Sequence, residues 1–311
     1  MATSTRLVRL PVEMNVTYKT RSLWWDVFLQ IRKNRLAVVA VIVLLVIILG
    51  ITFGPLVWRV DPTYIDIIAS FSPMTAQHPM GADNLGRDTL ARVMSGGRIS
   101  LAIGVTAMLI AMFIGTLVGV LAGYFKSLDN ALMRLTDMFL SLPLLPLLLV
   151  ITLLFRDSLR TAFGPEAGIF ILTVVIIGAL GWMPTARLVR GEVLSVKERD
   201  FITAARSLGA SDLSIIRAHI LPNVLSPVIV SATFAIAAAI ITESALSFLG
   251  LGFPPDFPTW GRLLFDGKDS LALAPALVAW PGIMISLTVL CVNFIGDGLR
   301  DALDPRLRKS R

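Results

Sequence analysis

Charged residues are scarce in this sequence. Asp, Glu, Lys and Arg make up 16% of the 311 residues, and hydrophobic residues make up 55%. Soluble globular proteins average about 25% charged and roughly 45–50% apolar residues, whereas the mean hydropathy of this chain is +0.78. The composition therefore excludes a water-soluble globule and predicts a membrane protein. Because each span takes about 20 residues, the chain has room for about six or seven spans.

Cysteine and histidine are also rare, and this excludes most metal chemistry. The single cysteine, Cys291, lies inside an apolar run, so the chain can form no internal disulfide, thiolate zinc cluster or iron–sulfur site. The two histidines, His78 and His219, are expected on opposite sides of the membrane and cannot share a metal ion. We therefore expect this chain to bind no metal and no cofactor.

A phosphate-binding loop is missing as well. The segment 261–268 comes nearest, but it has five residues between its glycines where the loop needs four. Asp269 also stands where a Ser or Thr would hold magnesium. We expect no nucleotide site and no catalytic residue, so the chain is not an enzyme by itself. The formal charge of +7 is attributed to Lys and Arg residues that set the orientation of the chain in the membrane, and no nucleic-acid partner is expected.

What the sequence does contain is six long runs without an ionisable residue. Their hydrophobicity is continuous and does not alternate, which favours helices over the strands of a barrel. The expected fold is an all-α membrane protein with six transmembrane helices, at 36–58, 99–125, 138–155, 167–186, 220–242 and 270–296.

The distribution of Lys and Arg predicts the orientation of these helices. Twenty of the 28 fall in segments on one side of the membrane, and eight fall in segments on the other. Because the cytoplasmic side carries the excess of positive charge, both termini and the long loop before the fifth span are expected in the cytoplasm. The segments on the positive side are 1–35, 124–137, 183–222 and 299–311.

The expected organisation follows the spans. Residues 1–35 form a cytoplasmic N-terminal segment, in which 22–31 is either an interfacial helix or a plain aromatic and basic anchor. The first transmembrane helix, an outer segment, a core of five helices and a cytoplasmic tail then follow, at 36–58, 59–98, 99–298 and 299–311.

Two patterns within the spans predict how the helices pack. Small residues recur every four positions in the second span, which favours close helix packing over contact with substrate. They are Ala107, Ala111, Gly115, Gly119 and Gly123. In the third span, Pro143 and Pro146 should bend or break the helix.

No ionisable residue falls near the centre of any span. A secondary transporter or channel that works without ATP would show inverted repeats, interrupted helices and midplane polar groups, and an intramembrane enzyme would need ionisable or nucleophilic groups within the bilayer. Both alternatives are therefore disfavoured. Glu243 comes nearest to a span centre. A helix that starts at Val224 carries Glu243 about 29 Å along its axis, to the outer interface, where we expect it to face an aqueous vestibule.

The loop 187–222 carries the most informative pattern. Apolar residues over 193–208 fall on one helical face, and the pattern stops at Gly209, a typical C-terminal cap. Ser211 or Asp212 should cap a second short helix that Pro222 ends. Two short helices joined by a glycine turn would present a plug for a soluble partner, and the alternative is an amphipathic hairpin on the membrane surface.

Several motifs resemble one known family. Ala204-Ala205, then Gly209, then Ile220-Leu221-Pro222 are similar to the EAA signature, the cytoplasmic coupling loop of permease subunits of bacterial ABC importers, although Thr203 replaces the leading Glu. The stretches HPMGADNLGRDTLARVMSGGRISL at 78–101, RAHILPN at 217–223 and ESALSFLGLGFPPDFPTWGRLL at 243–264 resemble permeases for dipeptides, oligopeptides and nickel. The resemblance runs from about 34 to 306.

The resemblance implies a type I ABC importer permease fold in the bacterial inner membrane. It implies a second, similar permease that completes the pathway, two ATPase subunits that use ATP and Mg, and a periplasmic substrate-binding protein. Peptide is the expected substrate, and nickel or another small solute is the alternative.

The resemblance also assigns residues to the two ends of the molecule. Coupling to the ATPase is assigned to Thr203, Ala204, Ala205, Leu208, Gly209, Ser211, Asp212, Ile215, Ile216 and Pro222. The outer vestibule, where the binding protein delivers its ligand, is assigned to Asp83, Arg87, Asp88, Glu243 and Trp260.

Overall fold

The computed structural model describes residues 29–303, which form helices and loops without a strand. Most of the segment 22–31 and residues 304–311 of the tail lie outside the described residues. The helices are α2 (Arg35–Val57), α3 (Thr89–Tyr124), α4 (Lys126–Ser141), α5 (Leu144–Phe163), α6 (Pro165–Leu180), α7 (Met183–Lys197), α8 (Asp200–Ser207), α9 (Asp212–Ile215), α10 (Leu221–Phe248), α11 (Trp260–Gly267) and α12 (Ala276–Leu303). Short 3-10 turns lie at Ile67–Ala69 and Lys268–Ser270, and a π-helical turn lies at Ile216–Ile220.

Five helical stretches of the described chain are long and apolar enough to cross a membrane. They are α2, α3, the pair α6 and α7 (Pro165–Lys197), the stretch Asp212–Phe248 that includes α10, and α12. Helices α4 and α5 meet at an angle of 86° and form a sixth span when they are counted as one broken span. In this form the prediction of six transmembrane helices is confirmed.

The break between α4 and α5 arises from the sequence at its centre. Leu142 precedes Pro143, and the proline ring disfavours the helical conformation of the residue before it. Leu142 is accordingly extended, with φ −78° and ψ 139°, and α5 restarts at Leu144. Pro143 therefore breaks the third span rather than only bending it, whereas Pro146 lies in the first turn of α5.

The glycines in the ridge of small residues on α3 pack closely against α7, and their spacing predicts a close helix contact of this kind. A Cβ atom added to Gly119 would lie 2.7 Å from the carbonyl oxygen of Ala186 and 2.7 Å from Val189. One added to Gly123 would lie 2.7 Å from Val193. Only glycine allows the two backbones to approach this closely, which is how helices associate where lipid provides no hydrophobic drive.

Helix α2 is joined to α3 by Arg98, which bonds to a carbonyl of α2 that a proline leaves without its helical N–H donor. Pro55 has no backbone N–H, so the carbonyl of Ile51 loses its normal partner in the helix. The Arg98 side chain of α3 donates to that carbonyl at 3.0 Å and to the carbonyl of Thr52 at 2.7 Å. The two helices are thus joined by polar contacts as well as by apolar packing.

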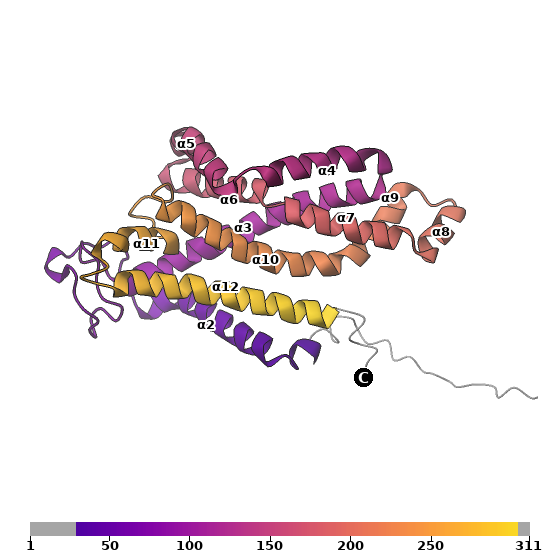
Figure 1. Ribbon diagram of the computed structural model, residues 1–311. Helices are drawn as coiled ribbons and strands as arrows, with labels where there is room; N and C mark the ends of the chain where they lie inside the picture. The colour runs from indigo at the N-terminus through magenta and orange to yellow at the C-terminus, as the bar shows by residue number, and fades with distance from the viewer. Residues whose placement is uncertain (1–28, 304–311) are drawn as a thin grey trace, which may run out of the picture.

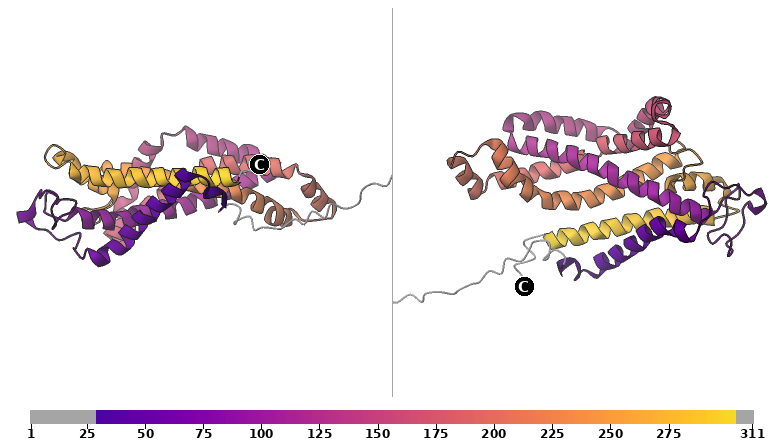
Figure 2. Two further views of the ribbon diagram at one scale, coloured as in Figure 1. Left: turned by 90° about the horizontal axis from the view of Figure 1, so that it is seen from below. Right: turned by 180° about the vertical axis from the view of Figure 1, so that it is seen from behind.

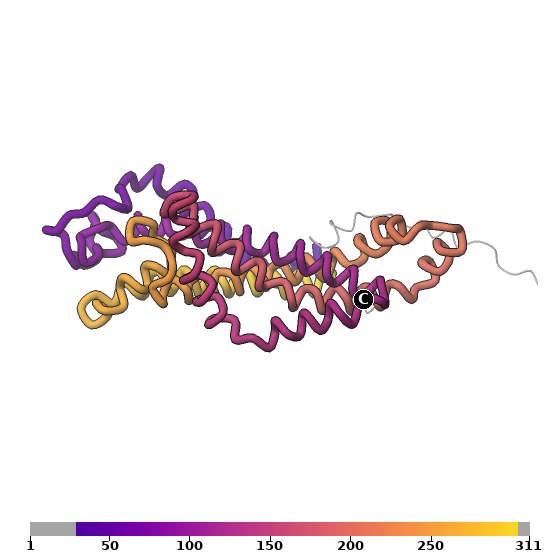
Figure 3. Tube along the Cα trace, turned by 90° about the horizontal axis from the view of Figure 1, so that it is seen from above, coloured from indigo at the N-terminus to yellow at the C-terminus, as the bar shows by residue number. Residues whose placement is uncertain are grey.

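The helices form an elongated bundle with two distinct ends (Figures 1 and 2). Helices α8 and α9 lie at one end, and the start of α2 and the end of α12 point towards it. Helix α11 and the segment between α2 and α3 lie at the other end, as the trace seen from above also shows (Figure 3). Below, the first is called the α8 end and the second the α11 end.

Candidate functional site

The loop between α7 and α10 begins differently from the sequence expectation. A single helix over 193–208 is wrong, because α7 ends at Lys197, Arg199 is extended (φ −79°, ψ 145°) and α8 starts at Asp200. Val193 and Ile202 are nine residues apart, about 900° along one helix, and would lie on opposite faces of it. Both side chains are fully buried in one apolar cluster. The break turns α8 so that both can reach that cluster.

Gly209 ends α8 in the conformation that the sequence predicts. Its φ is +83°, a region that glycine adopts without the steric penalty of a Cβ atom. The N–H of Gly209 donates to the carbonyl of Arg206 at 2.9 Å, and the N–H of Ala210 donates to the carbonyl of Ala205 at 3.1 Å. This pair of bonds is the Schellman motif, which satisfies the last carbonyls of a helix.

Helix α9 follows directly, and it does not end at Pro222. Ser211 caps α9, since its hydroxyl accepts from the N–H of Ser214 at 3.4 Å. The chain then passes through the π-helical turn Ile216–Ile220 into α10. The expectation that Pro222 ends the second helix is wrong, because Pro222 lies in the first turn of α10, where a missing N–H is tolerated.

The π-helical turn has a clear packing consequence. Ile215 and Ile220 are five residues apart, or about 140° around a regular α-helix, yet both are fully buried in the same cluster. The extra residue that a π turn contains allows both side chains to face that cluster. The Asn223 side chain also donates to the carbonyl of His219 at 2.7 Å. These contacts explain the structural role of RAHILPN at 217–223.

The predicted coupling residues divide between the surface and the cluster beneath it. Ile215 is buried, Ala205 and Ile216 are half-buried, and the others are exposed, namely Thr203, Ala204, Leu208, Gly209, Ser211, Asp212 and Pro222. Leu208 has 89% of its surface exposed. Leu213 and Phe201 are also exposed, at 57% and 45%, although they were not among the predicted coupling residues.

The α8 end therefore offers an apolar surface over a rigid base. Beside Leu213 lies a shallow depression of about 450 Å³ lined by Ser211, Ser214, Arg217 and Ala218. Of the three exposed apolar side chains at this end, Leu213 lines the depression. We define the surface of Phe201, Leu208 and Leu213 as the α8 surface.

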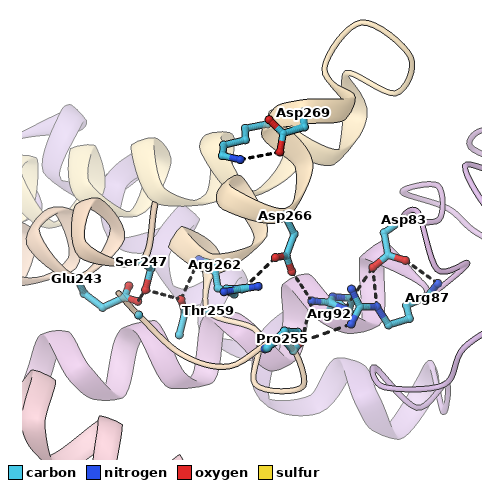
Figure 4. Close-up of polar contacts among 12 residues, drawn as sticks. Asp83, Arg87, Arg92, Glu243, Ser247, Pro255, Thr259, Arg262, Asp266 and Asp269 are labelled. Atoms are coloured by element: carbon cyan, nitrogen blue, oxygen red, sulfur yellow. Dashed lines mark hydrogen bonds and ion pairs between the residues drawn. The ribbon is translucent and has the colours of Figure 1, made fainter. Parts of the chain in front are cut away.

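At the α11 end, charged side chains form a buried network (Figure 4). The Arg92 guanidinium lies 3.2 Å from Asp83 and 3.1 Å from Asp266, and it also donates to the carbonyl of Pro255 at 3.2 Å. Arg87 pairs with Asp83 at 2.7 Å, and Arg262 pairs with Asp266 at 2.8 Å. Charges this deeply buried are stable only when they are paired. The network joins α3 and α11 to the segment before α3.

Asp88 holds the start of α3 in the same region. Its carboxylate accepts from the N–H of Ala91 at 2.8 Å and from the indole of Trp58 at 3.1 Å. The carboxylate also lies 3.0 Å from His78. Capping by Asp88 explains why α3 begins at Thr89, ten residues before the uncharged run at 99–125.

Glu243 lies in a second polar cluster and is not open to water. Only 1% of its surface is exposed, so the expectation that it faces an aqueous vestibule is wrong. The hydroxyl of Ser247 donates to its carboxylate at 2.7 Å, and the hydroxyl of Ser100 donates at 3.4 Å. The same Ser100 hydroxyl accepts from the backbone N–H of Trp260 at 3.2 Å. Glu243 thus ties α10 to α3 and α11.

All five predicted vestibule residues lie at the α11 end, but none is exposed in this chain. The exposed fractions of Asp83, Arg87, Asp88, Glu243 and Trp260 are 8%, 4%, 2%, 1% and 0%. Their side chains are occupied by internal contacts, such as the bond from the Trp260 indole to the carbonyl of Val93 at 3.0 Å. They shape the α11 end without lining an open cavity.

An apolar cavity between α3, α5, α6 and α10 has a volume of about 80 Å³, with Ala107, Leu148, Ile177 and Ala239 among its lining residues. Sites for small molecules usually measure about 300–1,000 Å³, so this cavity cannot hold a peptide. Among residues 29–303, no three His, Cys, Asp or Glu side chains are placed to bind a metal.

Comparison with known proteins decides the family. The family of binding-protein-dependent transport system inner membrane components matches residues 111–309. The chain belongs to this family. A second family, the N-terminal TM domain of oligopeptide transport permease C, matches residues 22–86.

Curated relatives of this permease cover nearly all of its length. The oligopeptide transport system permease protein of Salmonella typhimurium is 41% identical over 293 residues, which is 93% of each chain. The dipeptide transport system permease protein of Alkalihalophilus pseudofirmus is 38% identical, over 94% of this permease and 92% of that protein. Among solved structures, an inward-facing MetNI methionine ABC transporter aligns with a TM-score of 0.52 at 18% identity. The alignment covers 67% of this permease and 94% of that chain, and it supports the type I importer fold.

Proposed function

We propose that this chain is a permease subunit of an ATP-driven ABC importer for di- or oligopeptides. The observation that carries the proposal is the 41% identity to an oligopeptide permease over 93% of both chains. The α8 surface supports it, because its exposed apolar side chains offer a docking face for a soluble partner.

In this mechanism the α8 surface docks on an ATPase subunit in the cytoplasm. The exposed Leu208 and Leu213 fill apolar depressions of that subunit, while the buried Ile202 and Ile215 transmit the contact into the bundle. Closure of two ATPase subunits around ATP and Mg pushes α8 and α9. The push tilts the helices on either side of the loop, α7 and α10, and alternates access to the pathway.

The pathway requires a second permease. The internal cavity of about 80 Å³ is too small for a peptide, so the pathway forms between this chain and a similar partner. The α11 end faces a substrate-binding protein in the periplasm, and the residues around Asp83 and Glu243 hold that end in shape. An even number of spans places both termini on the same side, and the excess of Lys and Arg favours the cytoplasm for that side. The proposed order of segments is kept, although α3 already begins at Thr89 and α12 runs to Leu303.

Peptide is the proposed substrate because the curated relatives at 35–41% identity are named for peptide transport. A nickel or other small-solute permease is the alternative that the sequence motifs leave open. Selection of the ligand rests mainly on the binding protein.

Reconstitution tests the proposal directly. The chain is purified with its neighbouring permease and ATPase gene products, placed in liposomes with the binding protein outside, and supplied with ATP inside. We expect uptake of a labelled tripeptide that depends on ATP, and neither uptake nor hydrolysis by this chain alone. Uptake of nickel without peptide uptake would show that nickel, and not peptide, is the substrate. Uptake that needs no ATP would refute the proposal of an ATP-driven importer.

A further inference from the structure

One buried tyrosine connects the coupling loop to the longest helix. Tyr124 is the last residue of α3 and is 4% exposed. Its hydroxyl donates to the carboxylate of Asp212, the first residue of α9, at 2.6 Å. Arg206 of α8 donates to the same hydroxyl at 3.5 Å. Lys197, the last residue of α7, donates to the carbonyl of Tyr124 at 2.7 Å.

These contacts bring four helices together at one residue. The Lys197 ammonium and the Arg206 guanidinium lie 5.5 Å and 5.7 Å from the centre of the Tyr124 ring, within the range of cation–π attraction. The phenol hydroxyl therefore has one acceptor and one donor, which fixes its direction. A bond from a neutral hydroxyl to a carboxylate is among the stronger hydrogen bonds in proteins.

Packing alone would not require this hydroxyl. Phenylalanine would fill the same space and keep both cation–π contacts, but it would lose the bond to Asp212. Asp212 is itself exposed, so its carboxylate would be solvated if it were not held by Tyr124. The hydroxyl therefore contributes a directional link between α3 and α9 beyond the apolar contacts of the cluster.

Helix α3 can carry a displacement from this link across the membrane. It has 36 residues, which corresponds to a length of about 54 Å. Its other end is held by the Asp88 cap and by the ion pairs of Arg92 with Asp83 and Asp266. A displacement of α9 therefore moves α3 through Tyr124, and α3 is held at its other end by the contacts of the α11 end.

We propose that Tyr124 is the positioning residue that couples α8 and α9 to α3, so that its hydroxyl transmits ATPase movement to the periplasmic end. This inference rests on the proposed function. It adds a specific bond, Tyr124 to Asp212, through which the coupling loop acts on a helix outside that loop.

The test uses the complete transporter in lipid nanodiscs. ATP hydrolysis is measured with and without the binding protein loaded with tripeptide, and the ratio is the stimulation. Tyr124→Phe should leave assembly and unstimulated hydrolysis as in wild type, and should lower the stimulation by about tenfold, which corresponds to about 1.4 kcal/mol. Thr136→Val is the control, since it removes a buried hydroxyl that bonds only within α4.

Variants of Asp212 separate a directional bond from general packing. Asp212→Ala should lower the stimulation as Tyr124→Phe does, and the double variant should be no worse than either single variant. Asp212→Asn retains an acceptor oxygen and should restore most of the stimulation. Additive losses, or a Tyr124→Phe variant with wild-type stimulation, would refute the link. If the wild-type complex itself shows no stimulation by loaded binding protein, the proposed function fails instead.

Discussion

Substitution of Gly209 tests the backbone conformation of the turn between α8 and α9 separately from side-chain packing. A Cβ atom at this position would meet no atom within 4 Å, and φ is +83°. The effect of a side chain is therefore conformational. A residue with a Cβ atom costs about 1–2 kcal/mol in this region, and a β-branched residue costs more. Asparagine tolerates the region better than other non-glycine residues.

We expect the loss of coupling to increase from Gly209→Asn to Gly209→Ala and to be largest for Gly209→Val. A loss of about 1.4 kcal/mol lowers the population of the native turn relative to its alternatives by about tenfold. We expect normal membrane insertion in all three variants, with graded loss of ATPase co-purification and of stimulated hydrolysis. Both are measured on the transporter solubilised in mild detergent.

Gly191 provides the matched control. It lies inside α7 at an ordinary helical φ, and a Cβ atom there also meets nothing within 4 Å. Gly191→Ala should be neutral or slightly stabilising, because alanine is the better helix former. Equal behaviour of the three Gly209 variants and wild type would refute the role of the turn, as would equal damage by Gly191→Ala and Gly209→Ala.

Substitutions at three further positions test other parts of the molecule. Leu208→Asp should leave the thermal unfolding midpoint of the chain unchanged but abolish co-purification of the ATPase, since Leu208 is 89% exposed. Gly119→Val should destabilise the chain by about 1–3 kcal/mol through overpacking, and a wild-type unfolding midpoint would contradict the close contact with Val189. Glu243→Leu should lower the unfolding midpoint more than Glu243→Gln, because only leucine leaves the Ser247 hydroxyl without its buried acceptor. Equal midpoints would refute that role.

The sequence predicts features that depend on local chemistry. Gly209 separates two helical patterns, and a glycine in that place favours the left-handed conformation that the structure has. The spacing of Gly115, Gly119 and Gly123 predicts a close helix contact, although it does not say that the neighbour is α7. Pro143 predicts an interruption of the third span but not its angle of 86°.

Features that depend on distant residues could not be predicted. The rise along α10 places Glu243 near the outer interface, but the sequence does not show that Ser100 and Trp260 close around it. The bond between Tyr124 and Asp212 joins residues 88 positions apart, and no local pattern indicates it. The break between α7 and α8 likewise follows from the shared cluster of Val193 and Ile202, which forms only in the folded chain.

The most direct test of ATPase coupling is cross-linking from the α8 surface. A cysteine replaces Leu208 in a chain that carries Cys291→Ala, and the complete transporter is treated in its membrane with a short thiol-to-amine cross-linker. We predict a covalent product between this chain and the ATPase subunit, with an efficiency that changes on addition of ATP. Reaction of that cysteine in intact cells with a membrane-impermeant thiol reagent, without a cross-link to the ATPase, would place the loop on the wrong side of the membrane and contradict the mechanism.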